Sequence, residues 1–274
     1  MHVMQMCNAI SELGHEVTLL TPDAKYRTEK DVQDLFQFYG VNNGFRIKKL
    51  SFPKFKGRVY IYSMCIWHQL LKHKPDLVVG RSVQGCWVAT MLGYPTVFDS
   101  HGPIWESGFV NTLLFKQMIK RRSFVKMTVN SLALKNIYAS SNVVQQDTRI
   151  EVAHNGARLY GGERANLPGM NTFKAGYFGH LYPGRGVDVI IEVAKSMNDI
   201  DFVIVGGTDK EVAEWKEQTK SYNNIFLLGF KPPSDVYKYR NSCDVLLAPY
   251  QSKVAVAGGK GDSSKYMNPI KLLE

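Results

Sequence analysis

Short runs of β-branched and aromatic residues alternate with amphipathic stretches along the whole chain. Apolar residues between Met1 and Leu13 recur with helical spacing, and Gly14 stands where a helix C-terminal cap is expected. The following segment, 15–21, has the composition of a strand and precedes Pro22. This alternation is typical of α/β proteins, in which helices connect the strands of parallel sheets.

The same pattern predicts elements for the rest of the chain. Strands are expected at 45–50, 76–80, 96–100, 127–130, 149–153, 175–178, 201–205, 225–228 and 244–247. Helices are expected at 30–39, 58–73, 83–92 after a Ser82 cap, 111–126, from 131 onward, at 187–197, 209–221 and 234–241, and from 269 onward.

The stretch between Asn155 and Asn171 is irregular and rich in glycine. We therefore expect a Rossmann-like domain at 1–156, a linker at 157–172 and a second Rossmann-like domain at 173–274, with parallel sheets flanked by helices. The chain starts on a helix and stops at Glu274, barely one turn into another. These ends lead us to expect a fragment that is incomplete at both termini.

Composition excludes several classes of protein. With 45% hydrophobic residues among 274, the chain can bury real cores and is not a disordered protein. The four cysteines form no C-x-x-C pair, which excludes a zinc knuckle or a redox pair and suggests reduced thiols in the cytoplasm. The longest apolar run, 59–67, is too short for a membrane span.

The charge is divided unevenly. Residues 1–150 hold 19 Lys and Arg against 10 Asp and Glu, whereas residues 151–274 hold 15 against 14. Basic residues cluster at 46–58 and at 116–126. Such asymmetry indicates an anionic partner for the first half, either an anionic acceptor or a membrane surface, or else a solvated surface. No motif that stacks bases or reads a groove is present, so nucleic acid is not expected.

The loop Gly-His-Leu-Tyr-Pro-Gly-Arg-Gly at 179–186 follows one expected strand and precedes a helix. Ligands of open parallel sheets bind beyond the carboxyl ends of the strands, where helix N-termini hold anions. The glycines, free amides and Arg185 suit a diphosphate. Arg185 and Gly186 replace the Lys and Ser/Thr of a P-loop, and the spacing is not G-x-G-x-x-G. A plain turn with a solvated arginine fits the spacing equally well.

Two further residues are candidates with ordinary alternatives. Glu274 follows Pro269 by one helical turn and can accept hydrogen bonds from a ribose diol, or it can be a solvated helix charge. His101 follows the expected strand 96–100 and can serve a ligand, or it can hydrogen-bond to the loop backbone.

A series of blocks in order carries a resemblance. They are Val-Ala-His-Asn-Gly at 152–156, Tyr-Phe-Gly-His-Leu-Tyr-Pro-Gly-Arg-Gly-Val at 177–187, Phe-Val-Ile-Val-Gly-Gly at 202–207, Leu-Gly-Phe at 228–230, Asp-Val-Leu-Leu-Ala-Pro-Tyr at 244–250 and Lys-Leu-Leu-Glu at 271–274. The chain thereby resembles the retaining nucleotide-sugar glycosyltransferases of the glycosyltransferase B fold, group 1 or family 4. The match is good over 152–274 and looser before it.

The resemblance implies roles for particular residues. Arg185, among Gly179, Gly184 and Gly186, matches the cation that holds the donor diphosphate, and His180 stands where many members carry a second arginine. Phe230 and Lys231 match the loop that meets the nucleobase, and Tyr250 closes another matched block.

The C-terminal motif departs from the family pattern. Glu274 matches the second carboxylate of E-x7-E, which bonds the ribose, and Tyr266 stands where the first is expected. Met267 and Asn268 would offer amides to the sugar or phosphate instead. His101 matches the histidine that the family places near the donor sugar.

The implied activity is sugar transfer from a nucleoside-diphosphate sugar with retention of configuration and without a metal or other cofactor. The expected setting is polysaccharide, glycolipid or cell-envelope synthesis, in the cytoplasm or at the inner face of the membrane, on an anionic or lipid-linked acceptor. A non-catalytic nucleotide-sugar-binding protein and a sugar-nucleotide epimerase or phosphorylase on the same fold remain alternatives.

Overall fold

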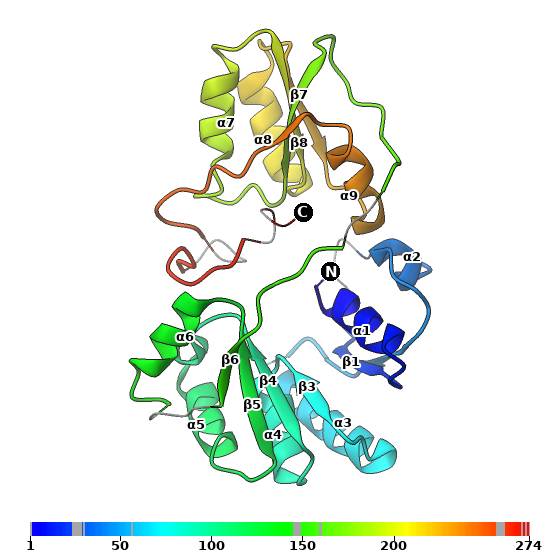
Figure 1. The fold of residues 1–274 in the computed structure, drawn as a ribbon, viewed down its shortest axis with the longest axis vertical. Helices are drawn as coiled ribbons and strands as arrows, with labels where there is room; N and C mark the ends of the chain where they lie inside the picture. Colours follow the sequence, from blue (N-terminus) through cyan, green and yellow to red (C-terminus); the bar gives the residue numbers. More distant parts are fainter. Residues whose placement is uncertain are drawn as a thin grey trace.

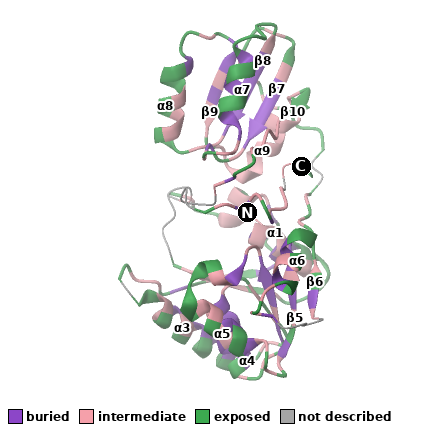
Figure 2. Cartoon of the chain, turned by 90° about the vertical axis from the view of Figure 1, so that its left-hand side faces the viewer, coloured by how far each residue is buried: buried purple, intermediate pink, exposed green. Residues whose placement is uncertain are grey.

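The computed structural model describes residues 2–23, 29, 31–55, 57–144, 149–158, 161–255, 261–269, 271 and 273. The N-terminal and C-terminal halves form two α/β bodies stacked along the longest axis (Figure 1). Both ends of the chain lie between the two bodies (Figures 1 and 2).

The first elements form a small parallel sheet. They are α1 (His2–Glu12), β1 (Thr18–Pro22), α2 (Leu35–Tyr39) and β2 (Arg46–Leu50). Strands β1 and β2 pair in parallel, and a core of Met4, Cys7, Val41 and Phe45 fills the space beside them. Gly14 adopts φ +90°, the left-handed conformation that permits the turn after α1.

A second sheet completes the N-terminal half. Its elements are α3 (Arg58–His73), β3 (Val78–Gly80), α4 (Val83–Met91), β4 (Thr96–Ser100), η2 (Ile104–Ser107), α5 (Phe109–Met118), β5 (Phe124–Val129), α6 (Leu132–Ala139) and β6 (Ile150–Val152). The strands run in the order β3-β4-β5-β6, all parallel. Helix α4 packs between α3 and α5.

The C-terminal half holds a third parallel sheet in the order β10-β7-β8-β9. Its elements are β7 (Phe173–Phe178), α7 (Val187–Ala194), β8 (Ile200–Val205), α8 (Asp209–Thr219), β9 (Ile225–Gly229), α9 (Pro233–Arg240) and β10 (Val245–Leu246). Strand β8 is buried along almost its whole length (Figure 2). A continuous apolar run of this kind is what a central parallel strand requires, because both of its faces are covered.

These elements confirm the predicted α/β class and the parallel sheets. The bounds of α3 and β4 are as predicted, and Ser82 caps α4 by accepting a hydrogen bond from the Gly85 amide at 3.2 Å. The helix predicted over 111–126 is wrong in length, because α5 ends at Met118. Phe124 instead begins β5 and is buried beside Thr96, so sheet pairing overrides the helical composition of the basic residues before it.

The described part of the segment between β6 and β7 contains no helix or strand and packs partly on the C-terminal half. The Ala165 amide donates to the Lys238 carbonyl at 3.1 Å, and Lys238 pairs with Glu163 at 2.9 Å. Asp201 is buried and accepts hydrogen bonds from the Asn171 amide and from Lys174. The entry to β7 is therefore fixed, while the exact domain bounds stay a prediction.

Tyr138 fixes the loop that follows β4. Its buried hydroxyl lies 3.0 Å from Ser100 Oγ, donates to the Gly102 carbonyl at 3.0 Å and accepts from the Ile104 amide at 3.0 Å. Burial raises the pKa of this phenol to about 12, so the hydroxyl stays protonated. The loop that carries His101 is thereby held by one side chain from α6.

We predict that Tyr138→Phe lowers the free energy of unfolding by about 1 to 3 kcal/mol, because the Ile104 amide loses its buried acceptor. Chemical denaturation of the variant and the parent measures this difference. Tyr60→Phe is the matched control, since Tyr60 is 71% exposed and its loss of a hydroxyl should change nothing. Equal midpoints for all three proteins would contradict the assigned role.

Candidate active site

The loop after β7 is built on glycines that other backbone approaches closely. Gly184 and Gly186 adopt φ of +82° and +81°, and a Cβ on either would lie about 2 Å from the carbonyl oxygen of Lys253 or Pro249. The Gln251 amide donates to the Gly184 carbonyl at 3.0 Å. Only glycine permits this packing, so the loop and the segment after β10 form one unit.

Two cations lie around one aromatic ring at this unit. Arg185 Cζ is 5.5 Å and Lys271 Nζ is 5.3 Å from the centroid of the Tyr250 ring. The two charges are therefore no more than about 11 Å apart. Lys271 also lies 3.6 Å from the Tyr177 ring centroid, beside Gly179.

Arg185 keeps donor capacity for a ligand. Its Nη2 donates to the Ala255 carbonyl at 3.4 Å, while its buried Nε has no hydrogen-bond partner among the described residues. No carboxylate of the described residues forms an ion pair with Arg185. The guanidinium stands at the N-terminus of α7, where the helix dipole also favours an anion.

His180 lies beside Arg185 and stacks on Tyr182 with ring centroids 4.8 Å apart. Burial lowers the pKa of its imidazole below the ordinary 6.5, and the positive charges of Arg185 and Lys271 lower it further. His180 is consequently neutral at pH 7. It can offer one hydrogen bond to an anion but no full charge.

Phe230 and Lys231 follow β9 and lie beside α2 of the N-terminal half. The Phe230 ring stacks with Phe38, centroids 6.4 Å apart and planes inclined by 26°. Lys231 Nζ lies 5.5 Å from the Tyr239 ring centroid. Helix α2 and the predicted nucleobase loop, which are far apart in the sequence, therefore contact each other through Phe38 and Phe230.

His101 lies at the carboxyl end of β4 in a small charged cluster. Its Nε2 is 2.9 Å from Asp99 Oδ2, Thr128 donates to Asp99 Oδ1 at 3.0 Å, and Arg81 Nε is 3.7 Å from Oδ2. Burial would raise the pKa of Asp99, but hydrogen bonds from His101 and Thr128 and the Arg81 charge outweigh it and keep the pKa low. Asp99 therefore remains ionised and orients the imidazole.

His2 completes this cluster, with its ring 5.2 Å from that of His101. Among the described residues, His2, Asp99 and His101 are the group whose ligand atoms are close enough to hold a metal ion, all within 4.8 Å. The donor set suits a divalent transition metal. Arg81 beside the same carboxylate oxygen opposes a divalent cation there by charge repulsion.

Tyr266, Met267 and Asn268 lie on the N-terminal half. Tyr266 is 7% exposed inside the N-terminal core, its hydroxyl donates to Glu106 at 3.1 Å, and its carbonyl accepts from Ser131 at 2.7 Å. Asn268 donates to the Asn130 carbonyl at 2.7 Å. The predicted contacts of these residues with a donor stay a prediction.

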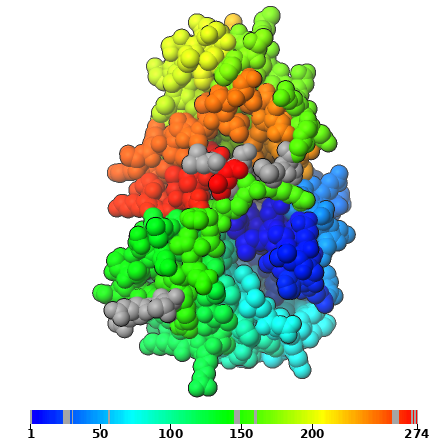
Figure 3. Space-filling view, viewed as in Figure 1, coloured from blue at the N-terminus to red at the C-terminus, as the bar shows by residue number. Residues whose placement is uncertain are grey.

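The same segment brings the two halves together. Asn268 is held at the end of β5, and Lys271, three residues later, contacts the end of β7. Three residues span at most about 11 Å of main chain, so one short segment contacts the carboxyl ends of both sheets. Figure 3 shows the C-terminal segment filling the space between the halves.

The structure therefore places these predicted site residues at three strand ends. Gly179, His180, Gly184, Arg185, Gly186 and Tyr250 lie together at β7, His101 lies at β4, and Phe230 and Lys231 lie at β9. Glu274 lies outside the described residues. Sequence reasoning did not name Lys271, Asp99 or Arg81 as site residues, although Lys271 belongs to a matched block and Asp99 stands two positions before His101.

No helix in the described part of the chain is long and apolar enough to cross a bilayer. Two family models match the sequence. The model of Glycosyltransferase Family 4 matches residues 1–159, and that of Glycosyl transferases group 1 matches residues 163–259. No curated protein matches the chain in sequence.

Solved glycosyltransferase structures share the fold. Sucrose-phosphate synthase from Thermosynechococcus elongatus is 14% identical, with 90% of this chain and 69% of that chain covered and a TM-score of 0.66. Anabaena HepE in complex with UDP-glucose is 16% identical, with 84% and 72% covered and a TM-score of 0.51. The lipopolysaccharide outer core galactosyltransferase WaaB is 11% identical, with 86% and 74% covered and a TM-score of 0.50.

We predict that Arg185→Ala raises the pKa of His180 toward 6.5 without reaching it, because burial, the larger cause of the lowered value, remains. An NMR titration of the imidazole in both proteins measures the shift. Lys220→Ala, which removes an exposed lysine at the C-terminal end of α8, should leave the titration unchanged. An identical midpoint with and without Arg185 would show that the two side chains do not interact.

Proposed function

Because the chain belongs to Glycosyltransferase Family 4, we propose that it moves a sugar from a nucleoside-diphosphate sugar to an acceptor with retention of configuration. The observation that carries this proposal is the pair of cations around Tyr250, at the N-terminus of α7. A diphosphate needs two or more positive contacts and free amides, and these groups supply both.

The leaving nucleoside diphosphate gains negative charge as the sugar departs. Arg185, Lys271 and the amides at the start of α7 are fixed before reaction, so they stabilise that charge without reorganisation. We propose that the acceptor enters on the face from which the diphosphate leaves, which retains the configuration. These two cations provide the charge that such a step needs, and we propose that it requires no metal.

His101 is proposed to orient the donor sugar. Asp99 accepts a hydrogen bond at the Nε2 side of the ring, which leaves Nδ1 as the other polar atom of the imidazole. Because one short segment contacts the carboxyl ends of both β5 and β7, we propose that a sugar on the diphosphate faces β4. Phe230 and Lys231 are proposed to contact the nucleobase, and Glu274 the ribose.

The acceptor is proposed to be anionic or lipid-linked. Residues 1–150 carry almost all of the net charge of +10. They form the N-terminal half of the fold, whereas the proposed donor site lies on the C-terminal half. Anabaena HepE binds UDP-glucose, and WaaB acts on lipopolysaccharide outer core, so relatives of this fold work on such donors and acceptors. We propose polysaccharide, glycolipid or cell-envelope synthesis, with contact at the inner face of the membrane.

One observation favours a second candidate, a nucleotide-sugar-binding protein without transfer. Tyr266 replaces the expected carboxylate and is buried against Glu106 rather than free to contact a donor sugar. Mass spectrometry of nucleoside diphosphate release from UDP-, GDP- and ADP-sugars separates the two. Nucleoside diphosphate release that depends on an added acceptor supports transfer. Donor binding without release, whichever acceptor is added, supports the second candidate.

We predict that Arg185→Ala reduces transfer efficiency at least tenfold at unchanged melting temperature, because each charge-assisted bond contributes roughly 1.5 to 3 kcal/mol. Arg185→Lys should recover part of the loss, since it keeps the charge but not the two-pronged geometry. Lys220→Ala, an exposed lysine elsewhere in the C-terminal half, is the control. Full activity of Arg185→Ala would remove the assigned role.

We predict the opposite effect for His180→Arg. The substitution adds a permanent charge next to Arg185, where the present imidazole is neutral, so nucleoside diphosphate should bind more tightly or equally well. Calorimetric titration with nucleoside diphosphate measures the change. Binding weakened at unchanged melting temperature would place the diphosphate away from this loop.

A further inference from the structure

Helix α3 presents an apolar stripe to solvent. Tyr60, Met64, Trp67 and Leu71 recur with the spacing of one helix face and are 71%, 74%, 39% and 49% exposed. Phe55 lies beside Tyr60, because both rings come within 3.9 Å of the point where a Cβ on Gly57 would stand. We call these five residues the α3 stripe.

The opposite face of the same helix packs against the core of the N-terminal half. Tyr62, Ile66 and Leu70 are buried and pack with Leu50 and Ala89. The α3 stripe is therefore apolar surface beyond what folding of this helix requires. Exposed apolar patches rimmed by polar residues mark interaction sites.

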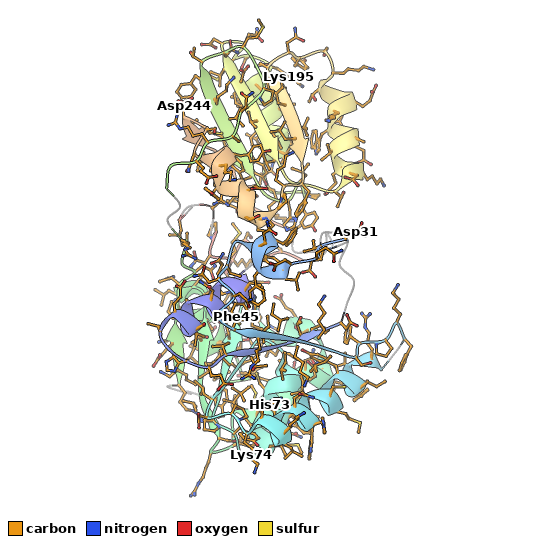
Figure 4. The ribbon with its side chains drawn as sticks, turned by 90° about the vertical axis from the view of Figure 1, so that its right-hand side faces the viewer. Asp31, Phe45, His73, Lys74, Lys195 and Asp244 are labelled. Carbon is orange, nitrogen blue, oxygen red and sulfur yellow. The ribbon has the colours of Figure 1, made fainter. Side chains whose placement is uncertain are left out.

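Basic residues surround the α3 stripe. Lys54, Arg58, Lys72 and Lys74 are exposed, and Arg58 is held over the Phe52 ring at 4.6 Å. From position 35 to position 75 the chain carries eight Lys and Arg and no Asp or Glu. The helix lies on the outside of the N-terminal half, and His73 and Lys74 lie at the end of that half remote from the C-terminal half (Figures 1 and 4).

We propose that the α3 stripe and its basic rim dock on the surface of an anionic lipid membrane. Tyr and Trp suit the boundary between headgroups and acyl chains, and lysines beside an apolar stripe add attraction to anionic lipids. This proposal deepens the membrane contact proposed above and names the residues that make it. It does not depend on the chemistry of the donor site.

The charge distribution argues against a second copy of the chain as the partner. A twofold contact brings the same patch of both copies together. The exposed rim of Lys54, Arg58, Lys72 and Lys74 would then face the same four basic residues of the other copy. Anionic lipid headgroups neutralise the same charges.

Flotation of the full chain with phosphatidylcholine vesicles, with and without phosphatidylglycerol, tests the proposal. The parent should bind only the vesicles that contain phosphatidylglycerol, and Met64→Glu combined with Leu71→Glu should bind them at least tenfold more weakly. Val189→Glu combined with Val193→Glu on α7 is the matched control. It makes the same change in net charge at residues of 41% exposure and should bind like the parent.

The basic rim is tested separately. Lys54→Gln and Lys72→Gln should each weaken binding to these vesicles about fivefold. Raised salt should weaken binding of the parent more than binding of the variant that combines the two substitutions. Melting temperatures of all variants should equal that of the parent, since every changed residue is exposed.

Three outcomes would overturn the proposal. They are a parent that binds neither vesicle, a glutamate pair on α3 that binds as well as the pair on α7, and a parent dimer in solution that the α3 pair dissociates. Vesicle binding is measured without donor or acceptor. A failed transfer assay with intact vesicle binding would therefore count against the proposed function alone.

Discussion

Docking of the segment 262–271 on both halves is the constraint on which the candidate site depends. Tyr266 is buried in the N-terminal core, Asn268 bonds to the end of β5, and Lys271 reaches the end of β7. Asp262 fixes the start of this segment by accepting hydrogen bonds from the Val254 and Ser264 amides, which lower its pKa to about 2. The proposed action of the groups at β4 and β7 on one ligand therefore rests on these contacts.

The fold could be predicted wherever local patterns and tertiary packing agree. The bounds of α3 and β4 follow from apolar periodicity ended by a proline or a glycine close by. The pattern over 111–126 misleads because Lys120 and Arg121 have helical composition, whereas the pairing of Phe124 with Thr96 decides where β5 begins. Pairing between distant residues has no signal in the local pattern.

The candidate site divides in the same way. The glycine loop with Arg185 could be identified because its parts are adjacent in sequence and its chemistry is carried by residue types. Docking of Tyr266 on Glu106 joins positions 160 residues apart, and no periodicity or spacing encodes it. Lys271 lies beside the loop through contacts with the rings of Tyr177 and Tyr250, which bring together three separate segments. Such convergence is a property of the folded chain.

The position of Lys271 links ligand binding to the arrangement of the two halves. The proposed diphosphate, held by Arg185 and Lys271 together, would favour the arrangement seen here, in which both charges lie around the Tyr250 ring. The same docked state buries Tyr266 in the N-terminal half. In the proposed function, donor binding and docking of this segment would therefore be parts of one equilibrium, in which each stabilises the other by the same free energy.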